Sequence, residues 1–360
     1  MIGDRKDDHV DYAIQQQRGG AGGNDFDAVS FVHHALAGID LGAVSLAAGL
    51  AGKPCAVPLF INGMTGGSTR TGIINRDLAI AARETGLPIA SGSVSAYLRD
   101  SSAADTYRVL RKENPHGFVM ANINAATTVE DALRAIDLLE ADALQIHLNA
   151  VQEIVMPEGD RDFDGWQARI EQIAAAVPVP VIVKEVGFGL SRETVLRVRD
   201  LGVAAADVGG RGGTNFARIE NSRRPVADYT FIEGWGQSTA ACLLDATGVR
   251  GVGILASGGV RSALDVARSL ALGAAAVGVA GPFLRTLVDH GVSALIDMIE
   301  TWLDQLRRIM TVLGAHTPAG LAECDLLIGG DLREFCRMRG IDADEFAVRS
   351  RRRNPDRPNS

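Results

Sequence analysis

Two glycine-rich segments in the last third of the chain have the composition of a phosphate site. Ser257–Arg261 reads SGGVR, and Ala280–Pro282 reads AGP. Glycines let backbone N–H groups approach an anion closely, and an arginine offers a phosphate a bidentate partner. Two tight turns that require glycine would also explain these segments. Because both segments have the same character, we favour phosphate binding.

A lysine stands inside an apolar run that has the character of a buried strand. Lys184 is part of Val181–Glu185, which reads VIVKE. A buried ammonium group needs an anionic or electron-rich partner. Glu185 is excluded as that partner, because adjacent side chains on a strand point to opposite faces. A ligand remains as the partner of Lys184, and so does an acidic residue on another strand.

Further along the chain, amide and carboxylate side chains are concentrated after a third apolar run. His147, Asn149, Gln152 and Glu153 precede the acidic turn Pro157–Asp160. Oxygen ligands of this kind suit hydrated Mg²⁺ and the positioning of a phosphorylated substrate. A histidine in an apolar strand is more often a core residue, but these polar neighbours favour a functional role for His147.

Composition and charge restrict the class of protein that carries these residues. The 360 residues are 46% hydrophobic and 22% charged, which excludes disordered, collagen-like and coiled-coil classes. The chain contains no apolar run of transmembrane length, and its first residues are charged rather than apolar. Four cysteines without CxxC spacing and a net charge of −8 indicate neither a zinc site nor nucleic-acid binding. We therefore expect a cytoplasmic globular protein with no membrane or nucleic-acid partner.

Eight short apolar runs have the length and composition of parallel strands buried on both faces. They are Val57–Asn62, Leu87–Ser91, Phe118–Ile123, Ala143–His147, Val181–Val186, Ala204–Val208, Val252–Ala256 and Ala275–Val279. Helical patterns lie between them, among them Val129–Glu140 with a capping box at Thr127 and Glu130, and Ala263–Leu272 with one at Ser262 and Asp265. Eight β–α alternations predict an α/β fold of the (β/α)8 TIM-barrel type, with a doubly wound sheet as the alternative.

We predict a single domain over residues 1–360, with a barrel core at about 55–310. Residues 1–54 would form an N-terminal arm that closes the barrel bottom or reaches over its top. The long insertion 209–250, after the sixth strand, has a length that is usually functional. Residues 345–360 contain five arginines and are expected to form a solvated, disordered tail. In a TIM barrel the active site lies at the carboxyl ends of the strands, where all the polar segments above fall.

Together these residues resemble the type 2 isopentenyl-diphosphate isomerases, which are FMN-dependent (β/α)8 enzymes. The resemblance extends from about Arg5 to the C-terminal helix, and the ordered set of motifs is far more specific than any one of them. The motifs are Arg5–His9 (RKDDH), Met64–Gly67 (MTGG), Asn122–Asn124 (NIN), Gln145–Asn149 (QIHLN), Gln152–Glu153 (QE), Pro157–Asp160 (PEGD), Lys184–Gly187 (KEVG), Gly210–Thr214 (GRGGT) and Ser257–Arg261 (SGGVR).

The resemblance implies roles for individual residues. Flavin contacts would be Met64, Thr65, Gly66, Ser93, Asn122, Lys184 and Thr214, and the FMN phosphate pocket would be Gly258, Gly259, Arg261, Ala280 and Gly281. The substrate diphosphate would be held by Arg5 and Lys6, with Ser93, Ser95, His147 and Asn149 near it. Gln152 and His147 would act on the substrate as the catalytic pair, and Glu153 would bind Mg²⁺.

The implied reaction converts isopentenyl diphosphate into dimethylallyl diphosphate by a net 1,3 proton shift. Protonating an unactivated alkene requires an acid–base group held within near-attack distance. The resemblance implies that reduced FMN supplies this group at its N5 without net redox change, and that NADPH serves only to reduce the flavin. A lysine beside the flavin would favour its anionic reduced form. We also expect a homo-oligomer, a tetramer or an octamer.

Two other kinds of flavin protein would share some of these motifs. An FMN-dependent 2-hydroxyacid oxidase would share the phosphate loops, but that family places a histidine base before Gly-Gly-Arg at the end of strand six. Here Val208 takes that place, before Gly209, and a valine cannot accept a proton. A non-catalytic flavin-binding protein would explain the phosphate loops, but neither Arg5 and Lys6 nor Gln152 and Glu153.

Overall fold

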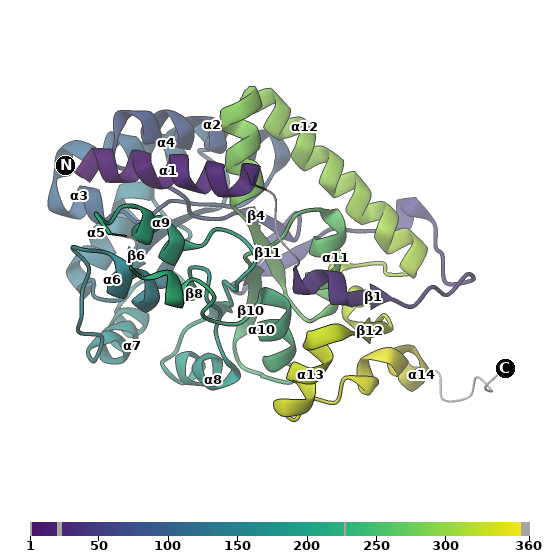
Figure 1. The fold of residues 1–360 in the computed structure, drawn as a ribbon. Helices are drawn as coiled ribbons and strands as arrows, with labels where there is room; N and C mark the ends of the chain where they lie inside the picture. Colours follow the sequence, from purple (N-terminus) through teal and green to yellow (C-terminus); the bar gives the residue numbers. More distant parts are fainter. Residues whose placement is uncertain (1, 20–23, 227, 354–360) are drawn as a thin grey trace.

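The structure, a computed structural model, describes residues 2–19, 24–226 and 228–353, without the side chains of residues 2–5, 352 and 353. Eight parallel strands form a closed barrel in which each strand pairs with its neighbours in chain order (Figure 1). They are β4 (Leu59–Ile61), β5 (Ile89–Ala90), β6 (Val119–Asn124), β7 (Ala143–Leu148), β8 (Val181–Glu185), β9 (Ala205–Asp207), β10 (Gly253–Ser257) and β11 (Ala276–Val279). All eight predicted strands are confirmed, and closure of the barrel excludes the doubly wound alternative.

Each barrel strand is followed by a helix that covers the outside of the barrel. These helices are α2 (Thr69–Thr85), α4 (Asp105–Glu113), α5 (Val129–Leu139), α7 (Trp166–Ala176), α8 (Arg192–Asp200), α10 (Thr239–Asp245), α11 (Ala263–Ala271) and α12 (Gly281–Leu313). Shorter helices α3 (Ser95–Arg99), α6 (Ala150–Val155) and α9 (Phe216–Ser222) lie in the loops at the carboxyl ends of the strands. The predicted insertion 209–250 therefore holds α9, the 3-10 turn η4 (Thr230–Ile232) and α10.

Helix caps follow from side chains at the predicted positions, with one exception. Ser262 caps α11 by accepting a hydrogen bond from Asp265 N, as predicted. The prediction that Thr127 caps α5 is wrong by one residue. Thr128 accepts the hydrogen bond from Asp131 N, because the Thr127 hydroxyl instead donates to Asn124 Oδ1 at 2.8 Å.

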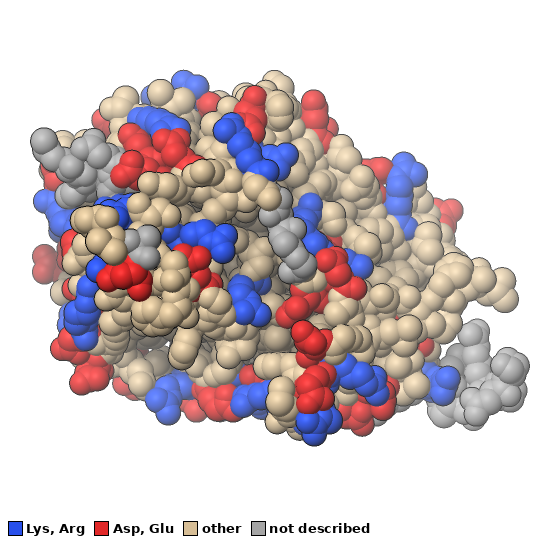
Figure 2. Space-filling model, viewed as in Figure 1, with Lys and Arg blue, Asp and Glu red and all other residues tan. Residues whose placement is uncertain are grey.

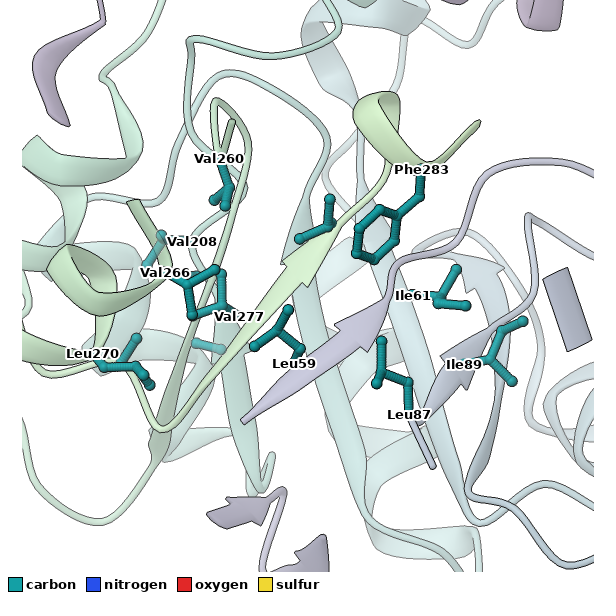
Figure 3. Close-up of a cluster of buried hydrophobic side chains, with 14 of the residues drawn as sticks. Leu59, Ile61, Leu87, Ile89, Val208, Val260, Val266, Leu270, Val277 and Phe283 are labelled. Carbon is teal, nitrogen blue, oxygen red and sulfur yellow. The ribbon is translucent and has the colours of Figure 1, made fainter. Parts of the chain in front are cut away.

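Strand residues alternate between two apolar layers, as expected for a period of two. On β4, Phe60 packs inside the barrel, whereas Leu59 and Ile61 pack outward against the helices. Figure 3 shows part of the outer layer, where side chains of several strands meet those of α11 and α12. Its labelled members are Leu59, Ile61, Leu87, Ile89, Val208, Val260, Val266, Leu270, Val277 and Phe283.

The N-terminal segment both reaches over the top of the barrel and closes its bottom, the two possibilities that the sequence left open. Helix α1 (Ile2–Arg18) lies across the carboxyl end of the barrel, next to α2 and α12 (Figure 1). The hairpin of β2 (Ala48–Leu50) and β3 (Lys53–Cys55) closes the opposite end, where Leu50 and Ala51 pack into the inner layer. Between them are η1 (Asp25–Ala28), β1 (Val29–Phe31) and η2 (Leu41–Ala43).

The C-terminal segment is folded against the body of the protein as far as the structure describes it. It contains η5 (Pro318–Glu323), β12 (Leu326–Ile328), α13 (Gly330–Met338), η6 (Asp344–Val348) and α14 (Arg349–Arg353), and β12 pairs with β1. The prediction of a disordered tail from residue 345 is therefore wrong for 345–353. Phe346 is buried, and the Arg349 guanidinium stacks on its ring and donates to Ala271 O at 2.7 Å. Residues 354–360 lie outside the described residues.

The remaining elements complete the surface. A further 3-10 turn, η3 (Ser101–Ala103), joins α3 to α4. Among the described helices, none combines the length and the hydropathy needed to cross a bilayer. On the described part of the face shown in Figure 2, basic and acidic side chains are mixed, and no continuous basic surface covers it.

Candidate active site

A cavity of about 460 Å³ opens at the carboxyl ends of the barrel strands, where the sequence predicted a site. The loops after β4, β8, β9, β10 and β11 form its walls, and α1 contributes His9, Gln16 and Gln17 to its rim. A cavity of this size is typical of sites for cofactors and small molecules.

At one end of this cavity the main chain is packed too tightly for any side chain. Gly258 and Gly259 have φ values of +91° and +73°. A Cβ on Gly258 would lie 2.1 Å from Gly210 O, and one on Gly281 would lie 2.4 Å from Gln17 Nε2. Gly281 is the first residue of α12, so unpaired N–H groups of a helix start beside this wall. Such an arrangement suits a phosphate group.

Arg261 lines the same end of the cavity, but its guanidinium group is shared between two carboxylates. It donates to Asp27 at 2.6 and 3.0 Å and, through Nε, to Asp265 at 2.9 Å. The hydrogen bonds that Arg261 donates to Asp27 and Asp265 raise its pKa further above its usual range. A phosphate contact by this guanidinium would therefore add to an ion-pair network that already anchors η1 to α11.

Lys184 is buried at the end of β8 and lines the cavity. Its Nζ donates to the main-chain oxygen of Glu185 at 3.2 Å, and burial lowers the pKa of the ammonium group. The Glu185 carboxylate takes a different direction, as the alternation of side chains requires. It accepts hydrogen bonds from Gly187 N and Phe188 N at 2.8 and 2.5 Å.

Two buried hydroxyl groups lack partners in the wall between β4 and β5. Thr65 Oγ1 and Ser91 Oγ have no hydrogen-bond partner among the described residues. Thr65 follows Met64, which lines the cavity, and Asn122 Nδ2 lies 3.4 Å from the position of a Cβ on Gly63. Because unsatisfied buried polar groups are costly, they indicate a missing polar ligand. The residues present therefore fit the FMN that the resemblance implies, with its phosphate at the glycine end.

His147 lies on β7, between this wall and Lys184. Its Nδ1 is 2.8 Å from Asn122 Oδ1, and Asn122 Nδ2 donates to Gln145 Oε1 at 3.0 Å. Since an amide oxygen only accepts, Nδ1 carries the proton and Nε2 keeps a lone pair. Burial, together with the charges of Lys184 and Lys6, lowers the pKa of His147 to about 3. The imidazole is therefore neutral at neutral pH.

Gln152 is held by a residue that the sequence analysis did not single out. Its Nε2 donates to Glu220 Oε1 at 2.7 Å, and the fully buried Glu220 also receives His9 Nε2 at 3.0 Å and Arg223 at 2.5 Å. Although burial opposes it, hydrogen bonds from His9, Gln152 and Arg223 lower the pKa of Glu220 to about 2. In the sequence, Glu220 is only one carboxylate within the insertion 209–250, and no spacing links it to Gln152.

Glu153 lies on the same short helix, α6, with oxygen atoms close by. Its carboxylate accepts hydrogen bonds from Asn149 Nδ2 at 2.7 Å and Asp160 N at 2.9 Å. Asn149 Oδ1 is buried and has no hydrogen-bond partner within the described part of the chain. Among the described residues there is no cluster of three or more metal-ligating side chains. One carboxylate and one amide oxygen fit Mg²⁺ only where waters and substrate phosphates complete its shell.

Helix α1 brings the predicted diphosphate clamp to the mouth of the barrel. Gln16 exchanges two hydrogen bonds with the main chain of Asn215, and Asp7 accepts one from Ser68 at 2.7 Å. The Lys6 side chain is buried and close enough to His147 to affect its pKa. The side chain of Arg5 lies outside the described part of the chain.

The structure thus brings most of the predicted residues together in two adjoining groups. The cavity is lined by Met64, Lys184, Thr214, Gly258, Gly259, Arg261, Ala280 and Gly281. The second group, on β6, β7 and α6, contains two hydrogen-bonded sets: Asn122 with His147, and Asn149 with Gln152 and Glu153. Thr65, Gly66, Ser93 and Ser95 belong to neither group. Thr65 and Gly66 adjoin Met64, while Ser93 and Ser95 follow β5, where Ser95 N donates a 3.4 Å hydrogen bond to Ser93 Oγ.

Comparison with known proteins identifies the family. The chain is 66% identical over 350 residues to a protein of Nocardia farcinica named isopentenyl-diphosphate delta-isomerase, and the match covers 97% of both chains. Proteins of the same name from Kitasatospora griseola and a Geobacillus species are 66% and 48% identical, over 96% of this chain and 95% and 99% of theirs. The chain belongs to the isopentenyl-diphosphate delta-isomerase family.

Membership of the isopentenyl-diphosphate delta-isomerase family is consistent with the other comparisons. Residues 112–326 match the family model of FMN-dependent dehydrogenases. Solved structures of a mandelate oxidase variant and a flavocytochrome b2 variant have the same fold, with TM-scores of 0.61 and 0.63. They cover 91% and 84% of this chain and 98% and 76% of their own, at 18% and 19% identity. At such low identity they show the barrel fold alone.

The structure agrees with the sequence at Val208, which takes the place of the histidine base of the 2-hydroxyacid oxidases. Val208 is fully buried in the outer apolar layer, immediately after β9. Since it offers no proton acceptor to the cavity, the oxidase alternative is not favoured for this isopentenyl-diphosphate delta-isomerase family member.

Proposed function

We propose that this protein interconverts isopentenyl diphosphate and dimethylallyl diphosphate with bound, reduced FMN. The observation that carries the proposal is 66% identity, over 97% of both chains, to a relative named for this isomerase. The site geometry supports it, because a flavin-sized cavity adjoins a cluster of neutral hydrogen-bonding groups and one carboxylate. Reduced FMN would supply the acid–base group for the 1,3 proton shift.

The chain's own residues would hold the cofactor at its two ends. The backbone at Gly258, Gly259 and Gly281, with Ala280 and Arg261 beside it, would bind the FMN phosphate. Met64, Thr65, Gly66, Ser93, Asn122 and Thr214 would contact the ring. Lys184 would direct its ammonium group at the ring and stabilise negative charge there.

The substrate diphosphate would lie between α1 and β7. Arg5 and Lys6 would supply positive charge, and Ser93, Ser95, His147 and Asn149 would donate or accept hydrogen bonds. Neutral His147 keeps an acceptor nitrogen, so it can take up a proton as the negatively charged substrate enters. Glu153, helped by the unsatisfied oxygen of Asn149, would hold a Mg²⁺ ion that neutralises the diphosphate.

Gln152 would orient the alkenyl part of the substrate. Its amide cannot exchange protons at neutral pH, so its contribution is a fixed direction of donor and acceptor. The anionic Glu220 fixes the Nε2 side of that amide. Gln152 and His147 would then be the pair that acts on the substrate.

Three further features belong to the same proposal. NADPH would reduce the flavin before the first turnover, and it would not be consumed in the isomerisation itself. The protein would work in the cytoplasm, where its substrates are soluble diphosphates. It would assemble as a homo-oligomer, a tetramer or an octamer.

The proposal is tested by the spectrum and activity of the purified protein. We expect a bound flavin spectrum and conversion of isopentenyl diphosphate only after reduction with dithionite in the presence of Mg²⁺. Turnover of a 2-hydroxyacid by the oxidised protein would favour the oxidase alternative. Flavin binding with neither activity would favour a non-catalytic flavin protein.

Removing residues 1–8 should raise the apparent KM for isopentenyl diphosphate at least about tenfold while FMN stays bound. One charge-assisted contact contributes about 1.5–3 kcal/mol, and about 1.4 kcal/mol corresponds to a factor of ten. Lys6→Met should reproduce part of the effect. Asp11→Asn, which breaks the exposed ion pair between α1 and Arg70 without removing positive charge, is the control. An unchanged KM in the truncated protein would exclude a diphosphate clamp on α1.

Glu220→Gln should lower kcat by about tenfold or more and leave the FMN dissociation constant unchanged. A glutamine cannot accept hydrogen bonds from His9, Gln152 and Arg223 together, so the Gln152 amide would lose its fixed direction. Steady-state kinetics and an FMN titration measure the two effects separately. A parallel loss of FMN binding and kcat would indicate that Glu220 has only a structural role.

A further inference from the structure

An aspartate that none of the motifs contains lies at the centre of the barrel mouth. Asp207 is the last residue of β9 and is fully buried. Its Oδ1 accepts hydrogen bonds from Ser257 Oγ at 2.7 Å and Gly209 N at 3.2 Å, and its Oδ2 accepts one from Asn62 Nδ2 at 3.2 Å. A carboxylate is rarely buried to this extent unless it is paired. The donors come from the ends of β4 and β10 and from the turn after β9.

Asp207 is also the register partner of Lys184 on the neighbouring strand. Paired residues of adjacent strands place their side chains on the same face, so both point into the barrel mouth. Among the described residues Lys184 forms no direct ion pair, and its one hydrogen bond to them is donated to Glu185 O. Burial lowers the pKa of Lys184, and the charge of Asp207 is the largest effect that opposes this shift.

The other charged groups around Lys184 cannot replace Asp207. Glu185 acts on Lys184 more weakly than Asp207 does, and burial raises the pKa of Glu185 itself to about 7. On the other side of Lys184, His147 on β7 is neutral. Lys6, on α1, is positive, so it disfavours a positive charge on Lys184. Among the described residues, Asp207 is therefore the acidic side chain that acts most strongly on Lys184.

We propose that Asp207 is a positioning residue of the flavin site. It supplies the counter-charge that keeps the Lys184 ammonium group protonated, and it fixes the loops on either side of it. Asn62 connects it to the first of these loops, because Asn62 Oδ1 accepts a hydrogen bond from Gly63 N at 2.8 Å. Gly209 connects it to the second. Gly63 and Gly209 both line the cavity.

The inference rests on the proposed flavin site and makes a different prediction from it. Without the Asp207 charge, Lys184 would release its proton at a lower pH. It would then lose the positive charge through which it would contact the flavin. FMN binding would become dependent on pH in a range where the unaltered protein binds FMN evenly.

Asp207→Asn tests this by FMN titration of the apoprotein from about pH 6 to about pH 9. The asparagine keeps the shape and an acceptor for Ser257 but removes the charge. We expect the FMN dissociation constant of the variant to rise about tenfold or more across this range, since one unit of pKa corresponds to a factor of ten. The unaltered protein should change much less. Ser257→Ala, which removes one hydrogen bond and keeps the charge, should weaken binding equally at every pH.

A pH profile of Asp207→Asn that parallels the unaltered protein would overturn the proposal and leave the proposed function intact. Failure of the unaltered protein to bind FMN would instead count against the proposed function. Thermal unfolding gives a second test that does not require FMN. If Asp207 acts through Lys184, the double variant Lys184→Met/Asp207→Asn should be more stable than Asp207→Asn alone, because it leaves no unpaired buried charge. Equal or greater destabilisation of the double variant, or failure of both to fold, would contradict the pairing.

Discussion

Lys184→Ala should abolish most of the flavin-dependent isomerase activity and weaken FMN binding by about ten- to hundredfold. The residue is a buried lysine that lines the cavity. A charge-assisted hydrogen bond contributes about 1.5–3 kcal/mol, which sets this range. The FMN dissociation constant and the rate with saturating FMN are the two measurements.

Lys53→Ala is a matched control for this variant. Lys53 is an exposed lysine of the β2–β3 hairpin at the opposite end of the barrel. The Lys53→Ala variant should bind FMN and turn over at the rate of the unaltered protein. If Lys184→Ala also bound FMN and turned over normally, Lys184 would have no role at the cofactor.

Glu153→Gln should require far more Mg²⁺ than the unaltered protein, and raised Mg²⁺ should restore much of its rate. The substitution keeps an acceptor oxygen but removes the charge that holds the cation. It also forces a choice between the hydrogen bonds from Asn149 and Asp160, since only one amide oxygen remains to accept them. If Glu153 instead moved protons, no metal concentration could help, because an amide cannot exchange protons at neutral pH.

A Mg²⁺ titration of the initial rate, with saturating reduced FMN, separates these two roles. Asp164→Asn removes an exposed carboxylate from the same loop and should leave the titration unchanged. A flat, near-zero response of Glu153→Gln, with substrate and FMN still bound, would overturn the assignment of Glu153 to the metal.

The barrel could be predicted from the sequence because its strands are buried on both faces. Runs such as Val181–Glu185 are apolar almost throughout. The sequence therefore predicts that each strand exists, and only its ends differ from the structure by one or two residues. The tail was mistaken for a different reason. A run of arginines is usually solvated. Arg349, however, stacks on the buried Phe346 and donates to the main chain at the C-terminus of α11, which is distant in the sequence.

Residues of the site were predictable where local sequence carries the chemistry. The glycines of the phosphate loop and Lys184 stand out against their neighbours without any knowledge of the fold. Glu220 and Asp207 do not, because their meaning depends on partners that only barrel closure brings close. Gln152 and Glu220 come together from different strand loops, and Asp207 faces Lys184 only through the register of β8 and β9.

If the proposed function is right, the protein isomerises isopentenyl diphosphate with reduced FMN and without net redox change. The most direct test reduces the protein once, removes excess reductant without admitting oxygen, and adds isopentenyl diphosphate and Mg²⁺ in D2O. We expect many molecules of deuterated dimethylallyl diphosphate per flavin, with the flavin still reduced at the end. One product molecule or fewer per flavin, or oxidation of the flavin in step with product formation, would contradict it.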